Sequence, residues 1–101
     1  MVIEWLQFRV EPTQRQHFIQ ADAEIWTTTL AAYPGFLSKE VWLEPDQDDR
    51  VTLVIRWQTR EQWHAVPAEV LRATEARFAA AVRGDYQLLA AQEYQVRKFA
   101  P

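Results

Sequence analysis

Four stretches of the chain have the character of β-strands: the first, second and fourth alternate apolar and polar residues with a period of two, and the third is rich in β-branched and aromatic residues. The stretches are residues 2–10, 36–44, 51–58 and 88–99. In the first of them Val2, Leu6, Phe8 and Val10 share one face. A polar, turn-forming segment, residues 45–49, joins the second stretch to the third, so the pattern predicts a β-hairpin there.

The segment between the first two strands repeats apolar residues at helical spacing. A helix is predicted over residues 13–32, because Thr13 and Gln16 fit a capping box and Pro34-Gly35 ends the pattern. The apolar side of this helix carries Phe18, Ile19, Ile25, Trp26 and Leu30.

A second helical region precedes the last strand. Thr59 and Gln62 fit another capping box, which starts a short helical turn through Trp63. Pro67 then opens a longer helix that stops at Gly84-Asp85. One side of the longer helix is lined by Leu71, Thr74, Phe78 and Val82.

The resulting element order is βαββαβ within a single domain, residues 1–101. This order predicts a ferredoxin-like α+β fold, in which both helices cover one face of an antiparallel four-stranded sheet. Trp5, Trp42 and Leu89 lie on the less apolar face of their strands, which the helices leave open. Because an exposed apolar patch usually marks an interface, we expect a homodimer through the open sheet face, closing a dimeric α+β barrel.

Composition and charge exclude several classes of function. A net charge of −3 without clustered Lys and Arg argues against a nucleic-acid partner. The chain has no cysteine, which excludes disulfides and thiol chemistry. We find neither a signal-like N-terminus nor an apolar run that would span a bilayer, so no membrane partner and a cytoplasmic location are expected.

Four segments of the chain together carry a resemblance to known proteins: Val2-Ile-Glu-Trp-Leu-Gln-Phe8, Tyr33-Pro-Gly-Phe36, Leu53-Val-Ile-Arg-Trp57 and Thr59-Arg-Glu-Gln-Trp63. With these segments the chain resembles the antibiotic-biosynthesis-monooxygenase-like superfamily. The chain is most similar to a branch whose members share Asp22-Ala-Glu-Ile-Trp-Thr27 and Lys39-Glu-Val-Trp42. The resemblance spans nearly the whole chain and implies a dimeric α+β barrel with a pocket between sheet and helices in each subunit.

The chain departs from this superfamily at positions that carry chemistry in other members. Many members have a His in the helical segment after the third strand, where this chain has Val66. The haem-degrading members share an Asn, Trp and His triad, whereas this chain has no Asn and offers Glu75 near the place of that His. No catalytic residue is therefore carried over from the superfamily, and no cofactor is expected.

Asp22 is the most informative single residue, because helical spacing places it on the apolar side of its helix, between Phe18 and Trp26. A buried carboxylate is costly unless it is paired, and Arg56 and His64 are the candidate partners. We predict that the three residues form a catalytic group in which Asp22 is a base or orients a ligand. A structural ion pair is the alternative interpretation.

Four further residues are predicted to bind a small-molecule substrate: Trp26, Trp63, Thr74 and Glu75. Tryptophans can stack on a flat ligand, although they more often fill cores and interfaces. Neither His17 nor His64 has a second ligand at metal-binding spacing, so no metal site is expected.

Three functions are compatible with the fold. The first is a cofactor-independent, monooxygenase-like enzyme acting on a small aromatic or otherwise flat organic substrate. The second is a non-catalytic small-molecule-binding or sensing module. The third, an RNA-recognition domain of the same topology, is excluded because residues 51–57 lack the required aromatic platform.

Overall fold

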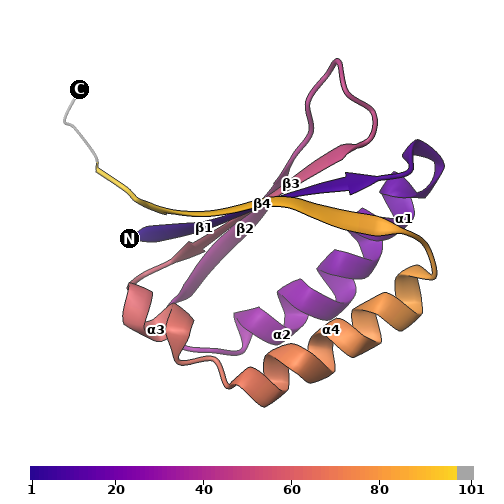
Figure 1. Ribbon diagram of the computed structural model, residues 1–101. Coiled ribbons are helices and arrows are strands. Elements are labelled where there is room, and N and C mark those ends of the chain that lie inside the picture. Colours follow the sequence, from indigo (N-terminus) through magenta and orange to yellow (C-terminus); the bar gives the residue numbers. More distant parts are fainter. Residues whose placement is uncertain (98–101) are drawn as a thin grey trace.

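A computed structural model describes residues 1–97, which form a four-stranded antiparallel sheet in the order β2-β3-β1-β4. The helices lie on one face of this sheet, as Figure 1 shows. The predicted ferredoxin-like α+β fold is therefore confirmed. The strands and principal helices are β1 (Val2–Val10), α1 (Arg15–Asp22), α2 (Thr28–Ala31), β2 (Phe36–Trp42), β3 (Arg50–Trp57), α3 (Arg60–His64), α4 (Ala68–Val82) and β4 (Tyr86–Gln95).

Two bulges interrupt the regular strand pairing. Between β2 and β3 the register shifts around Leu37, and between β1 and β4 it shifts around Leu89. A bulge leaves one residue unpaired and bends its strand, so neither residue follows the simple alternation expected from the sequence. The observed β4 starts at Tyr86, earlier than predicted, and Phe99, the predicted end, lies outside the described residues.

The first helical region consists of several short pieces. It opens with a 3₁₀ turn, Pro12–Gln14, and a π-helical turn, Ala23–Thr27, separates α1 from α2. No side chain caps the start of the 3₁₀ turn or of α1, so the predicted capping box is wrong. The physical reason is that Thr13 lies inside the turn that Pro12 starts, instead of preceding it.

The second helical region follows its prediction closely. The hydroxyl of Thr59 accepts a hydrogen bond from the backbone N–H of Gln62 at 3.1 Å, which confirms the cap of α3. Pro67 directly precedes α4. Thr74 and Phe78 are buried on α4, as expected, and the helix ends at Arg83 in the left-handed conformation, with φ of 58°.

The core lies between the sheet and the helices and has two buried clusters. One contains Phe18 and Phe78, whose rings meet edge to face with centroids 5.1 Å apart. The other contains Leu30 and Trp57. Leu6 and Trp26 pack against both clusters while staying partly exposed, which marks the place where the core is open.

The opposite sheet face has no helix over it (Figure 1). On this side Trp42 is 46% exposed and Trp5 is half-buried. Leu89, which is unpaired at the bulge of β4, is 40% exposed. Val54, in the centre of the face, is already buried by its neighbours in the single chain. A partner over this face stays a prediction. None of the helices within residues 1–97 is long and apolar enough to cross a membrane.

Candidate functional site

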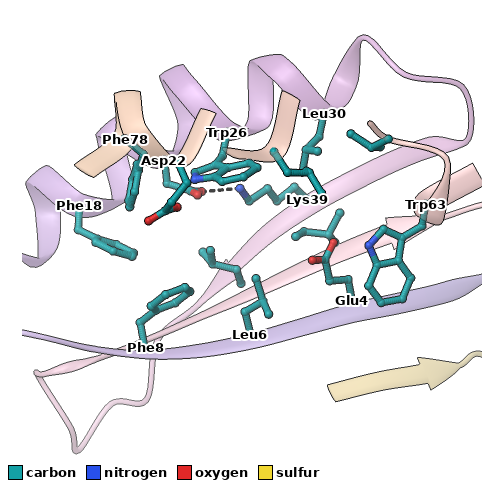
Figure 2. Close-up of a pocket in the computed structure, with 15 residues that line it drawn as sticks. Glu4, Leu6, Phe8, Phe18, Asp22, Trp26, Leu30, Lys39, Trp63 and Phe78 are labelled. Carbon is teal, nitrogen blue, oxygen red and sulfur yellow. Dashed lines mark ion pairs between the residues drawn. The ribbon is translucent and has the colours of Figure 1, made fainter. Parts of the chain in front are cut away.

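A cavity of about 230 Å³ lies between the helices and the sheet. Most of its wall is apolar, with Leu6 and Phe8 from β1, Leu53 and Ile55 from β3, and Phe78 from α4. Figure 2 shows Leu6 and Phe8 on one side of the gap and Phe78 on the other. Ligand sites are typically concave and mostly apolar with a few placed polar groups, and this cavity has that character.

A buried ion pair forms one wall of the cavity. The Nζ atom of Lys39 lies 2.7 Å from a carboxylate oxygen of Asp22, and the two side chains are only 4% and 2% exposed. Figure 2 marks this pair with a dashed line beside the ring of Trp26. Burial raises the pKa of Asp22, and the charge of Lys39 offsets that effect only in part.

The partner of Asp22 is thus Lys39, so the prediction that Arg56 or His64 pairs with it is wrong. Lys39 lies on β2 opposite Ile55, on the helix-covered face of the sheet. The signal for this was present in the sequence, because strict alternation along β2 puts Lys39 on the same face as Val41.

Glu4 is a second, half-buried acid that the sequence interpretation missed. It lines the cavity from β1, between Val2 and Leu6 on the inward face, and is paired across the sheet with Ile55. The indole Nε1 of Trp57 donates a hydrogen bond to its carboxylate at 3.4 Å. Burial raises the pKa of Glu4, while the Trp57 hydrogen bond and then the charge of Lys39 lower it to a smaller extent.

Two of the predicted catalytic residues lie away from the cavity. Arg56 is on β3 opposite Ser38 and forms an ion pair of 2.6 Å with Glu40 on the open face. The side chains of neighbouring residues in a strand point to opposite faces, and Ile55 already faces the cavity. His64 is exposed at the end of α3, where its ring meets Trp63 with centroids 4.7 Å apart.

Three of the four predicted binding residues line the cavity, namely Trp26, Trp63 and Glu75. Thr74 does not, because it is buried and its hydroxyl donates to the carbonyl oxygen of Val70 at 2.7 Å. The hydroxyl of Tyr86 donates to the carboxylate of Glu75 at 2.6 Å. Burial and the adjacent carboxylate together raise the pKa of Tyr86.

The chemistry available in the cavity is that of carboxylates, one ammonium group and indole rings. Within residues 1–97, no cluster of three or more His, Asp or Glu side chains is arranged to hold a metal ion. The ammonium of Lys39 can stabilise negative charge that develops on a ligand, because charges interact strongly where water is excluded. The π-helical turn starts directly after Asp22, and such turns often occur at functional sites.

Comparison with known proteins identifies the family. Residues 1–69 match the model of a family described as antibiotic biosynthesis monooxygenase. No match was found among curated proteins.

Solved structures show the same fold at low sequence identity. SnoaB, a cofactor-independent oxygenase from Streptomyces nogalater, is 18% identical with a TM-score of 0.70, covering 99% of this chain and 96% of its own. A monooxygenase of Streptomyces coelicolor from the gene ActVA-Orf6, in complex with nanaomycin D, is 16% identical with a TM-score of 0.72, covering 99% and 90%. A conserved protein from Methanosarcina mazei Go1 is 12% identical with a TM-score of 0.67, covering 95% and 92%. Because the family match covers more than half of the residues, this chain belongs to the antibiotic biosynthesis monooxygenase family.

Proposed function

We propose that this protein is a cofactor-independent, monooxygenase-like enzyme that acts on a small, flat aromatic substrate bound in the cavity. The observation that carries the proposal is the combination of an apolar cavity with one ion pair, Asp22 and Lys39, in its wall. Family membership supports the reaction class, as does the fold shared with a cofactor-independent oxygenase.

The size of the cavity limits the substrate. Its volume of about 230 Å³ is below the roughly 300–1,000 Å³ typical of sites for drug-sized ligands. A molecule of one or two fused rings therefore fits better than a larger polycycle. Trp26 and Trp63 line the cavity and offer flat faces on which such rings can stack.

The electron balance limits the substrate further. In a reaction without a cofactor, the electrons that reduce dioxygen must come from the substrate itself, which favours an electron-rich phenol. A phenol and one dioxygen molecule yield a quinone and one water molecule: one oxygen atom replaces a ring hydrogen, and the other leaves as water. The ring reacts as the phenolate, and Lys39 would stabilise that anion while Asp22 holds the ammonium in place.

The test is oxygen consumption by the purified protein with a naphthol as substrate. Isotope-labelled dioxygen should place one labelled atom in the quinone product, as mass spectrometry would show. Lys39→Met should abolish turnover, whereas Arg56→Ala on the open face should leave it unchanged. If Lys39→Met consumed oxygen at the wild-type rate, the proposal would be contradicted.

A non-catalytic binding module is the second candidate, and one observation favours it. Asp22 and Lys39 already satisfy each other at 2.7 Å, which is the geometry of a structural ion pair that needs no catalytic role. Quenching of tryptophan fluorescence reports binding directly, since Trp26 and Trp63 line the cavity. Saturable quenching by a naphthol without any oxygen consumption would favour the binding module over the enzyme.

A further inference from the structure

The charges around the cavity do not cancel. Asp22 and Lys39 neutralise each other at 2.7 Å, which leaves the carboxylate of Glu4 without a counter-ion of its own. Glu75 also lines the cavity, but it is an exposed residue, and its carboxylate accepts a hydrogen bond from the hydroxyl of Tyr86. Glu4 is therefore the acid in the cavity wall whose charge is least compensated.

The carboxylate of Glu4 is free to accept a further hydrogen bond. Among the described residues it has one hydrogen-bond donor, the indole Nε1 of Trp57, at a long 3.4 Å. Glu93 faces it from the neighbouring strand β4, but Arg60 neutralises Glu93 at 2.6 Å. In Figure 2 the carboxylate points into the cavity near Trp63 and on the side opposite Asp22.

We infer that Glu4 accepts the hydroxyl proton of the bound ligand, so that the cavity selects neutral phenols and rejects carboxylates of the same ring shape. This inference rests on the proposed function, since it names the substrate class of the same site. A ligand hydroxyl donates to Glu4, whereas a ligand carboxylate brings a second negative charge beside it in a mostly apolar cavity.

Glu4 would also take part in the reaction. Proton transfer breaks the phenol O–H bond and forms the O–H bond of a neutral Glu4 carboxyl, and the electron pair stays on the phenolate oxygen. The Lys39 ammonium in the same cavity then stabilises the phenolate. The raised pKa of Glu4 brings it closer to that of a phenol, about 10, which makes the transfer easier.

The test compares a naphthol with the naphthoate of the same ring skeleton at neutral pH. Tryptophan fluorescence quenching gives both dissociation constants. We expect the wild-type protein to bind the naphthol at least tenfold more tightly than the naphthoate. Equal affinity for the two ligands would overturn the inference without the need for any variant.

Glu4→Gln is the matched variant, because it keeps the shape of the side chain and removes the charge. We expect the preference for the naphthol to fall by about tenfold, since an amide N–H can donate to a carboxylate. Glu69→Gln makes the same change at an exposed position in the first turn of α4, and its preference should equal that of the wild type. If Glu4→Gln kept the wild-type preference for the naphthol over the naphthoate, the inference would be overturned.

The two proposals fail in different ways. A Glu4-dependent preference for the naphthol without oxygen consumption supports the inference and contradicts the proposed enzyme. Oxygen consumption that proceeds at the wild-type rate in Glu4→Gln supports the enzyme and contradicts the role of Glu4.

Discussion

Asp22 and Lys39 are held in a region where neither charge is solvated. Their side chains are 2% and 4% exposed, so both have lost nearly all contact with water. Removing a charge from water is costly, and each group is tolerated because the other lies within hydrogen-bond distance. The pair therefore restricts how helix and sheet can be arranged around the cavity, whatever net stability it contributes.

Removal of one partner should be strongly destabilising. In Asp22→Asn the Lys39 ammonium stays buried without a counter-charge, and we expect the free energy of unfolding to fall by roughly 3–5 kcal/mol. Urea denaturation measures this change. The double variant Asp22→Leu with Lys39→Met should lose less than Asp22→Asn alone, because no unpaired charge remains. The coupling would be disproved if the double variant lost as much free energy of unfolding as the single variants Asp22→Leu and Lys39→Met lose when added together.

The ion pair on the open face is the control for this experiment. Arg56 and Glu40 lie 2.6 Å apart with side chains 26% and 47% exposed, so water screens their attraction. Arg56→Ala should lower the free energy of unfolding by no more than about 1 kcal/mol.

Burial of Glu4 should make stability depend on pH. Its pKa is raised above the ordinary value of 4.5, so the folded state keeps the proton to a higher pH than the unfolded state does. The contribution of protonated Glu4 to the free energy of unfolding is fully present below pH 4.5 and is lost as the pH rises through the pKa of the folded state. Relative to wild type, Glu4→Gln should therefore gain stability as the pH rises above the ordinary value of 4.5. Urea denaturation across this range checks the trend, and a constant difference would refute it.

At the scale of elements, the entry into β2 depends on one backbone conformation. Gly35 has φ of 91°, a region that residues with a side chain rarely adopt. Its carbonyl oxygen accepts the backbone N–H of Gln58 at 2.7 Å, which links the turn after α2 to the end of β3. A Cβ atom at this position would lie 2.5 Å from Cβ of Gln62 in α3.

Gly35→Ala should consequently be destabilising for two reasons, the positive φ and the collision with α3. We expect the free energy of unfolding to fall by more than about 1 kcal/mol. Gly84 is the matched control, because the atoms nearest to an added Cβ are 3.8 Å away. Gly84→Ala should change stability by less than about 0.5 kcal/mol in the same denaturation experiment. Equal effects at the two glycines would contradict this explanation.

At the scale of the whole molecule, the two faces of the sheet differ. Helices cover the face that carries the cavity, while the other face exposes Trp42 beside the ion pair of Glu40 and Arg56. This open face is more polar than the three residues singled out from the sequence suggest. We still expect it to be the dimer interface, because a large aromatic side chain that is 46% exposed is stabilised when a partner covers it.

Sedimentation velocity at micromolar concentration tests this expectation. The wild-type protein should sediment as a dimer, and Trp42→Glu should sediment as a monomer, since a partner over this face would bury the introduced charge. Ala76→Glu, at an exposed position on α4, should leave the dimer intact. A wild-type monomer under these conditions would rule out the dimeric barrel.

Local patterns in the chain were sufficient for its fold. The period of two along three strands, the β-branched and aromatic residues of the other strand and the helical spacing between them predicted the βαββαβ order, and the inward face of β1 followed from the same alternation. The same alternation contained the signals for Glu4 and Lys39 as inward residues. The sequence interpretation assigned neither residue to a face of its strand.

Only the tertiary structure decided which buried charges meet. Asp22 closes α1 and Lys39 lies within β2, and their contact depends on where the helix crosses the sheet. That crossing position is set by the packing of Phe18 and its neighbours, and bulges at Leu37 and Leu89 shift the strand register. Periodicity specifies the face on which a residue lies, but the partner it meets there depends on distances that are set when the whole core packs.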